Sequence, residues 1–104
     1  MINYGKQSID ESDLDVVNQV LKEDFLTQGP HVENFENQLK SYFGSEYACA
    51  VSNGTAALHL SGLSLGWGRG DIILTSPITF LATVNSIVYS NATPDLVDIN
   101  LQDY

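Results

Sequence analysis

The chain has little positive charge, one cysteine and no long apolar run. It holds 4 Lys or Arg against 13 Asp or Glu, a formal net charge of -9, which disfavours nucleic acid and anionic membranes as partners because both are negative. The single cysteine, Cys49, excludes an internal disulfide. No apolar run approaches the roughly 20 residues that span a bilayer, and the start does not resemble a signal peptide. We therefore expect a cytoplasmic chain.

Two amphipathic helices are predicted in the first part of the sequence. Asp10 is a suitable N-terminal cap, and apolar residues recur at helical spacing over 10–22. A second such pattern runs over 32–43, where Gly44 is a typical C-terminal cap. Gly29-Pro30 interrupts the chain between them.

The pattern then changes to short apolar runs separated by helical stretches. Strands are predicted over 47–51, 71–75 and 94–99, with helices over 55–65 and 79–89. Strand, helix, strand, helix, strand is typical of a parallel sheet with right-handed crossovers. The predicted fold class is α/β: an amino-terminal helical arm over 1–45, then an incomplete α/β domain over 46–104. A sheet this small leaves an uncovered face and edge, which indicates that the chain is part of something larger.

The turn Asn53-Gly54-Thr55-Ala56 has the residue types that bind phosphate. It lies between a predicted strand and a predicted helix, whose first N–H groups carry partial positive charge. Gly54 lets a ligand approach the backbone, and the hydroxyl of Thr55 is an extra donor. The alternative is an ordinary connection between strand and helix, with Thr55 as the helix cap.

Phe80 is the second candidate ligand contact. It follows the predicted strand 71–75, and open α/β sheets bind ligands at the carboxyl ends of their strands. An aromatic ring in this place can stack on a flat heteroaromatic ligand. The alternative is a phenylalanine packed in the core.

Four segments in order resemble the DegT/DnrJ/EryC1/StrS family of pyridoxal-phosphate-dependent sugar aminotransferases. The resemblance implies the large domain of an aspartate aminotransferase-like, fold-type I enzyme. Leu26–Pro30 and Ser76–Phe80 are most similar to the pseudaminic-acid branch of the family, which implies transfer of an amino group from glutamate to C4 of a UDP-4-keto-6-deoxy-N-acetylhexosamine, by a homodimer. The four segments are Ser52–Leu58, Gly70–Ile73, Pro77–Thr83 and Ala92–Ile99.

The same resemblance implies roles for individual residues. Thr55 and Ala56 would bind the phosphate of pyridoxal 5'-phosphate, and Phe80 would stack on its pyridine ring. The residues implied to face the sugar nucleotide are Tyr4, Asp24, Phe25, Leu26, Thr27 and Gly54.

No catalytic residue is assigned. This chemistry requires a lysine that bonds to the cofactor and a carboxylate beside the pyridine nitrogen. In the family both residues belong to motifs further along the chain, and this sequence contains neither motif. Lys6, Lys22 and Lys40 all precede the phosphate turn. We therefore expect the isolated chain to be inactive. Three alternatives stay open: a dehydratase with histidine in place of the lysine, a small non-catalytic phosphate-binding α/β module, and a non-functional remnant of a broken gene.

Overall fold

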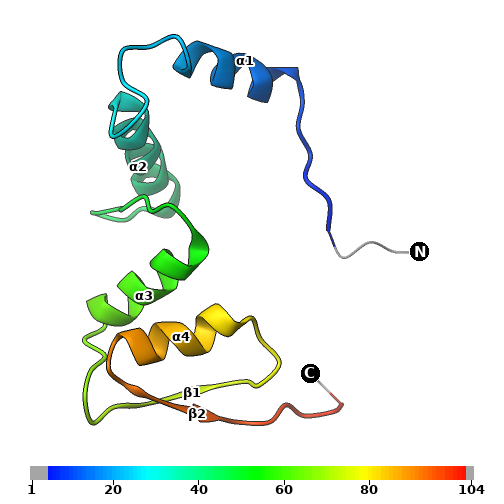
Figure 1. Cartoon of the computed structure of the whole chain (residues 1–104), viewed down its shortest axis with the longest axis vertical. Coiled ribbons are helices and arrows are strands. Elements are labelled where there is room, and N and C mark those ends of the chain that lie inside the picture. Colours follow the sequence, from blue (N-terminus) through cyan, green and yellow to red (C-terminus); the bar gives the residue numbers. More distant parts are fainter. Residues whose placement is uncertain (1–4, 103–104) are drawn as a thin grey trace. The chain divides into compact units, whose positions relative to one another are not determined.

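The computed structural model describes residues 5–102 and divides into two compact units, Met1–Ala50 and Val51–Tyr104. Each unit is described by itself. The first contains two helices, and the second contains two helices and two strands (Figure 1). In chain order the elements are α1 (Glu11–Val20), α2 (Pro30–Phe43), α3 (Gly54–Ser64), β1 (Ile72–Thr75), α4 (Leu81–Tyr89) and β2 (Thr93–Leu96).

Helix α1 begins at the N-terminal cap Asp10, as the sequence predicts. The Asp10 carboxylate accepts hydrogen bonds from the Ser12 N–H at 2.8 Å and from the Ser12 hydroxyl at 2.6 Å. The Asp13 carboxylate accepts the Asp10 N–H at 3.0 Å, which completes a capping box. The Ser12 hydroxyl, followed by the backbone N–H groups, lowers the pKa of Asp10 because these donors favour its charged form.

Helix α2 starts at Pro30, whose missing N–H costs nothing in the first turn. It ends at Gly44, which has a left-handed φ of 64° and donates its N–H to the Lys40 carbonyl. The predicted C-terminal cap is therefore confirmed. No residue of α1 or α2 is buried, so the apolar stripes that predict these helices are solvent-exposed in this unit.

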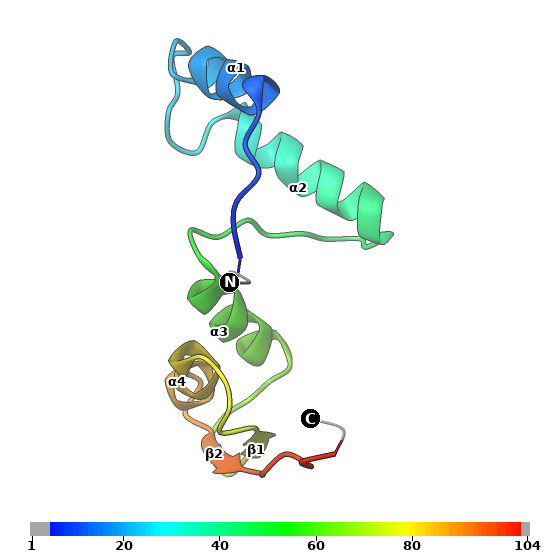
Figure 2. The same cartoon turned by 90° about the vertical axis from the view of Figure 1, so that its right-hand side faces the viewer.

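The second unit is a β-α-β arrangement with an additional helix. Strands β1 and β2 pair in parallel, with Ile72 opposite Thr93. Helix α4 packs against both strands on one side and against α3 on the other (Figures 1 and 2). The buried apolar side chains are Ala82 and Ile87 of α4 and Ala92 before β2. The α/β class and its parallel sheet are confirmed.

The strand predicted over 47–51 is not formed. Tyr47 is 79% exposed, and the Ala50 N–H donates to the Glu36 carboxylate at 2.8 Å instead of to a neighbouring strand. A strand requires a partner whose N–H and C=O groups face it. Within the described residues no strand pairs with this segment, because the sheet there contains only β1 and β2.

The helices within residues 5–102 are all too short or too polar to cross a bilayer.

Candidate functional site

The first turn of α3 presents two backbone donors. Asn53 caps the helix, and its Oδ1 accepts the Ala56 N–H at 2.9 Å. The N–H groups of Gly54 and Thr55 have no hydrogen-bond partner within the part of the chain that the structure describes. The alternative in which Thr55 caps the helix is therefore wrong, because Asn53 holds that position.

These donors fit a phosphate group. They lie at the positive end of the α3 dipole, where anions are stabilised. A Cβ atom added to Gly54 would meet nothing within 4 Å, so the backbone is open to a ligand on that side. Thr55 and Ala56 are half-buried. Binding through the Ala56 N–H would require it to leave or share its bond with Asn53.

Phe80 is the N-cap residue of α4 and is 79% exposed. Phe80 is therefore not packed in a core within the part of the chain that the structure describes. Figures 1 and 2 show α3 and α4 starting at the same end of the second unit, where the chain leaves the carboxyl end of β1. This is the end at which parallel α/β sheets bind ligands.

The predicted sugar-nucleotide residues Asp24, Phe25, Leu26 and Thr27 occupy the exposed loop between α1 and α2. Tyr4 lies outside the described residues. Gly54 is in the second unit, at the start of α3.

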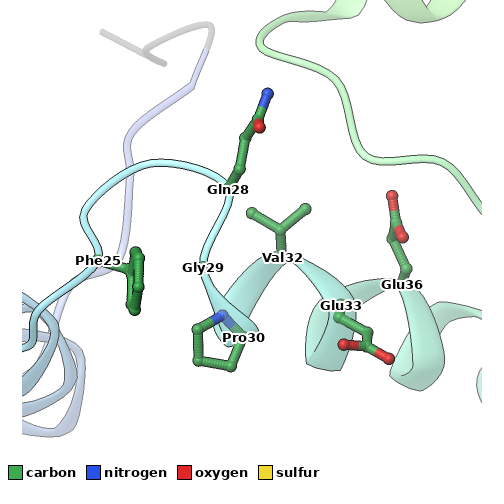
Figure 3. Close-up of a pocket in the computed structure, with 7 residues that line it drawn as sticks. All are labelled: Phe25, Gln28, Gly29, Pro30, Val32, Glu33 and Glu36. Carbon is green, nitrogen blue, oxygen red and sulfur yellow. The ribbon is translucent and has the colours of Figure 1, made fainter.

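An open hollow of about 430 Å³ lies beside the α1–α2 loop (Figure 3). Phe25 is the one residue on its wall that the sequence predicts to face a ligand. Gly29-Pro30 was recognised as a chain break and as part of the family-like segment Leu26–Pro30, and it also forms part of the wall. The lining residues are Phe25, Gln28, Gly29, Pro30, Val32, Glu33 and Glu36.

Residues 5–102 contain no group of three or more His, Cys, Asp or Glu side chains able to hold a metal ion.

Comparison with known proteins gives the same family across nearly the whole chain. Residues 7–104 match the model of the DegT/DnrJ/EryC1/StrS aminotransferase family. A UDP-4-amino-4,6-dideoxy-N-acetyl-beta-L-altrosamine transaminase of Campylobacter jejuni is 41% identical over 99 residues, which are 95% of this chain and 26% of that protein. The spore coat polysaccharide biosynthesis protein SpsC of Bacillus subtilis is 37% identical over 97 residues, 93% of this chain and 25% of that protein.

Solved structures agree with this match. PseC of Helicobacter pylori, an aminotransferase involved in the biosynthesis of pseudoaminic acid, superposes with a TM-score of 0.82 and 31% identity, over 94% of this chain and 27% of that chain. Spr1654 of Streptococcus pneumoniae, solved in pyridoxal-phosphate and pyridoxamine-phosphate forms, gives a TM-score of 0.82 and 29% identity, over 95% of this chain and 25% of that chain. Enzymes of this family use pyridoxal phosphate.

This chain spans about a quarter of the length of the relatives that it matches. The family match nevertheless covers far more than half of the chain itself, and the earlier resemblance rested on four segments that all lie within it. The chain belongs to the DegT/DnrJ/EryC1/StrS aminotransferase family.

Proposed function

We propose that this chain is the amino-terminal part of a pyridoxal-phosphate-dependent aminotransferase of nucleotide-sugar biosynthesis. In this proposal the whole protein moves an amino group from glutamate to C4 of a UDP-4-keto-6-deoxy-N-acetylhexosamine. The 41% identity to the Campylobacter jejuni transaminase supports the choice of substrate class. We further propose that the whole protein is a cytoplasmic homodimer.

The observation that carries the proposal is the pair of free N–H donors at the start of α3. Gly54 and Thr55 would bind the cofactor phosphate through these groups, and the Thr55 hydroxyl would add a third donor. Asn53 would keep the turn rigid by capping the helix at Ala56. Ala56 would contribute its small side chain, which leaves room for the anion beside the first helical turn.

Phe80 would cover one face of the pyridine ring. Its exposed side chain at the start of α4 leaves a ring face available for stacking. When bound, the cofactor supplies an electron sink for amino transfer. The contribution of this chain is therefore to bind and orient the cofactor.

The loop residues Asp24–Thr27 would contact the sugar nucleotide. Phe25 and Leu26 are 65% and 63% exposed, so both side chains are available to a ligand. Phe25 also lines the hollow beside α2, which gives an apolar wall for one part of the substrate (Figure 3). Tyr4 and Gly54 complete the proposed set.

The test is an amination assay on the polypeptide that the complete reading frame encodes. The protein is incubated with pyridoxal phosphate, glutamate and the UDP-4-keto sugar, and the sugar product is identified by mass spectrometry. The proposal expects a 4-amino sugar that carries nitrogen from labelled glutamate. Loss of the C3 hydroxyl as water, without nitrogen incorporation, would contradict it and favour the dehydratase alternative.

A further inference from the structure

A hydrogen bond between a histidine and a glutamate joins the two ends of the α1–α2 loop. Nε2 of His31 lies 2.9 Å from Oε2 of Glu23, and the two side chains are 45% and 39% exposed. An ionised carboxylate only accepts hydrogen bonds, so Nε2 of His31 carries the proton in this contact. Glu23 follows α1 and His31 is the second residue of α2, so the contact closes the loop over residues 24–30.

The loop inside this contact is tightly folded. A Cβ atom added to Gly29 would lie 3.1 Å from both the Cβ atom and the carbonyl oxygen of Phe25. Gln28 has a φ of 52°, in the left-handed region that few non-glycine residues adopt. Phe25 is therefore held against Gly29 on the wall of the hollow (Figure 3).

We propose that Glu23 and His31 are positioning residues: their hydrogen bond holds the loop in the conformation that presents Phe25 to the sugar nucleotide. This inference rests on the proposed function, because that function places Asp24–Thr27 against the substrate. The pair acts on the substrate only through the loop, and neither side chain lines the hollow.

The pair is partly exposed, so its removal loosens the loop without unfolding the helices. The ends of both helices form independently of this pair. Helix α1 is capped by Asp10, Ser12 and Asp13, and helix α2 starts at Pro30 and has Gly44 as its C-terminal cap. Partly exposed pairs of this kind contribute little free energy. We therefore expect the ratio of ordered to loosened loop to fall about two- to fivefold when the pair is removed.

The first measurement is 15N relaxation of the amides of residues 24–29 in the 104-residue chain. Glu23→Ala and His31→Ala should raise the mobility of these amides by the same amount, and the double variant should add little. Glu23→Gln should restore order, because an amide oxygen still accepts the His31 N–H. Asp15→Ala is the control for charge, because Asp15 is an exposed acid on α1 whose side chain makes no hydrogen bond or ion pair within residues 5–102. Unchanged mobility, or an equal effect of Asp15→Ala, would overturn the proposal.

The second measurement is binding of UDP-N-acetylglucosamine to the same variants. Glu23→Ala should weaken binding by at most about two- to fivefold, because affinity follows the fraction of chains whose loop is ordered, and Glu23→Gln should restore it. Equal binding by the wild type and Glu23→Ala, despite a mobile loop, would overturn the positioning role. Failure of the wild type to bind, while the loop still responds to the variants, would contradict the proposed substrate and leave the loop contact supported.

Discussion

The indole ring of Trp67 lies directly over Gly62 in the second unit. A Cβ atom added to Gly62 would lie 2.5 Å from Cε3 of Trp67 and 3.0 Å from the hydroxyl oxygen of Ser90. Gly62 is the one buried residue of α3. The absence of a side chain at this position is therefore what allows Trp67 to pack against α3.

Gly62→Ala should destabilise the second unit. Alanine in a helix interior normally stabilises by about 1 kcal/mol over glycine, but forcing a methyl group into a filled site costs about 1–3 kcal/mol. We expect faster hydrogen exchange of the α3 and α4 amides. Ser64→Ala, on the exposed part of the same helix, should slow exchange or leave it unchanged. Slower exchange in Gly62→Ala would show that Trp67 moves aside freely.

The helicity of α1 should depend on pH through Asp10. Its pKa in the folded chain is lowered from the ordinary value of 3.8 because the charged form accepts hydrogen bonds, first from the Ser12 hydroxyl. Because this pKa is lower in the folded chain than in the unfolded chain, the cap stabilises the helix fully at a pH above the unfolded-state pKa. This stability is lost as the pH falls through the folded-state pKa. Carbon-13 chemical shifts over residues 11–14 should report the loss.

Asp10→Asn is the matched variant for this effect. Asparagine also caps helices but has no carboxyl group, so the acid-dependent change at residues 11–14 should shrink. Asp15→Asn removes an equal charge from α1 without touching the cap and should leave the change intact. An identical pH profile in Asp10→Asn would show that another group controls the helix.

Replacing the cap of α3 should separate stability from anion binding. Asn53→Ala removes the acceptor for the Ala56 N–H and should cost about 1 kcal/mol. Asn53→Ser should retain most of the stability and the binding of pyridoxal phosphate. Asn53→Asp should cap the helix well yet weaken phosphate binding, because it places a negative charge beside the anion. Equal binding by the serine and aspartate variants, measured by fluorescence titration, would place the phosphate elsewhere.

Removing the Phe80 ring should affect ligand binding more than stability. Its side chain is 79% exposed, so Phe80→Ala loses little burial. Stacking contributes about 0.5–1.5 kcal/mol, so the affinity for pyridoxal phosphate should fall about two- to tenfold. Ile78→Ala, at a neighbouring position that is 71% exposed, is the control. Equal losses in the two variants would mean that Phe80 has no special contact with the ring.

The helices were predictable because their signals are local. Asp10 and Gly44 act on backbone groups within a few residues, and both caps form as the sequence predicts. Strands β1 and β2 were located to within a few residues for a similar reason, because each strand is marked by an apolar run next to a predicted helix. The run 47–51 is also short and mostly apolar, but its pairing depends on residues distant in sequence, so its local pattern predicted a strand that is not formed.

The hollow beside the α1–α2 loop was missed for a related reason. It depends on the left-handed φ of Gln28 and on the close approach of Gly29 to Phe25. Neither is visible in a periodicity pattern, although Gly29-Pro30 marked a turn. The cap at Asn53 could have been predicted, because asparagine is a stronger N-cap than threonine.

The most direct test of the central claim follows backbone amide shifts of the 104-residue chain as pyridoxal phosphate is added, with pyridoxal as the phosphate-free control. We expect the largest shifts to fall on Gly54 and Thr55 and to appear with pyridoxal phosphate alone, and we expect borohydride treatment to leave no cofactor on Lys6, Lys22 or Lys40. Equal shifts with pyridoxal, or the largest shifts outside the start of α3, would contradict this claim.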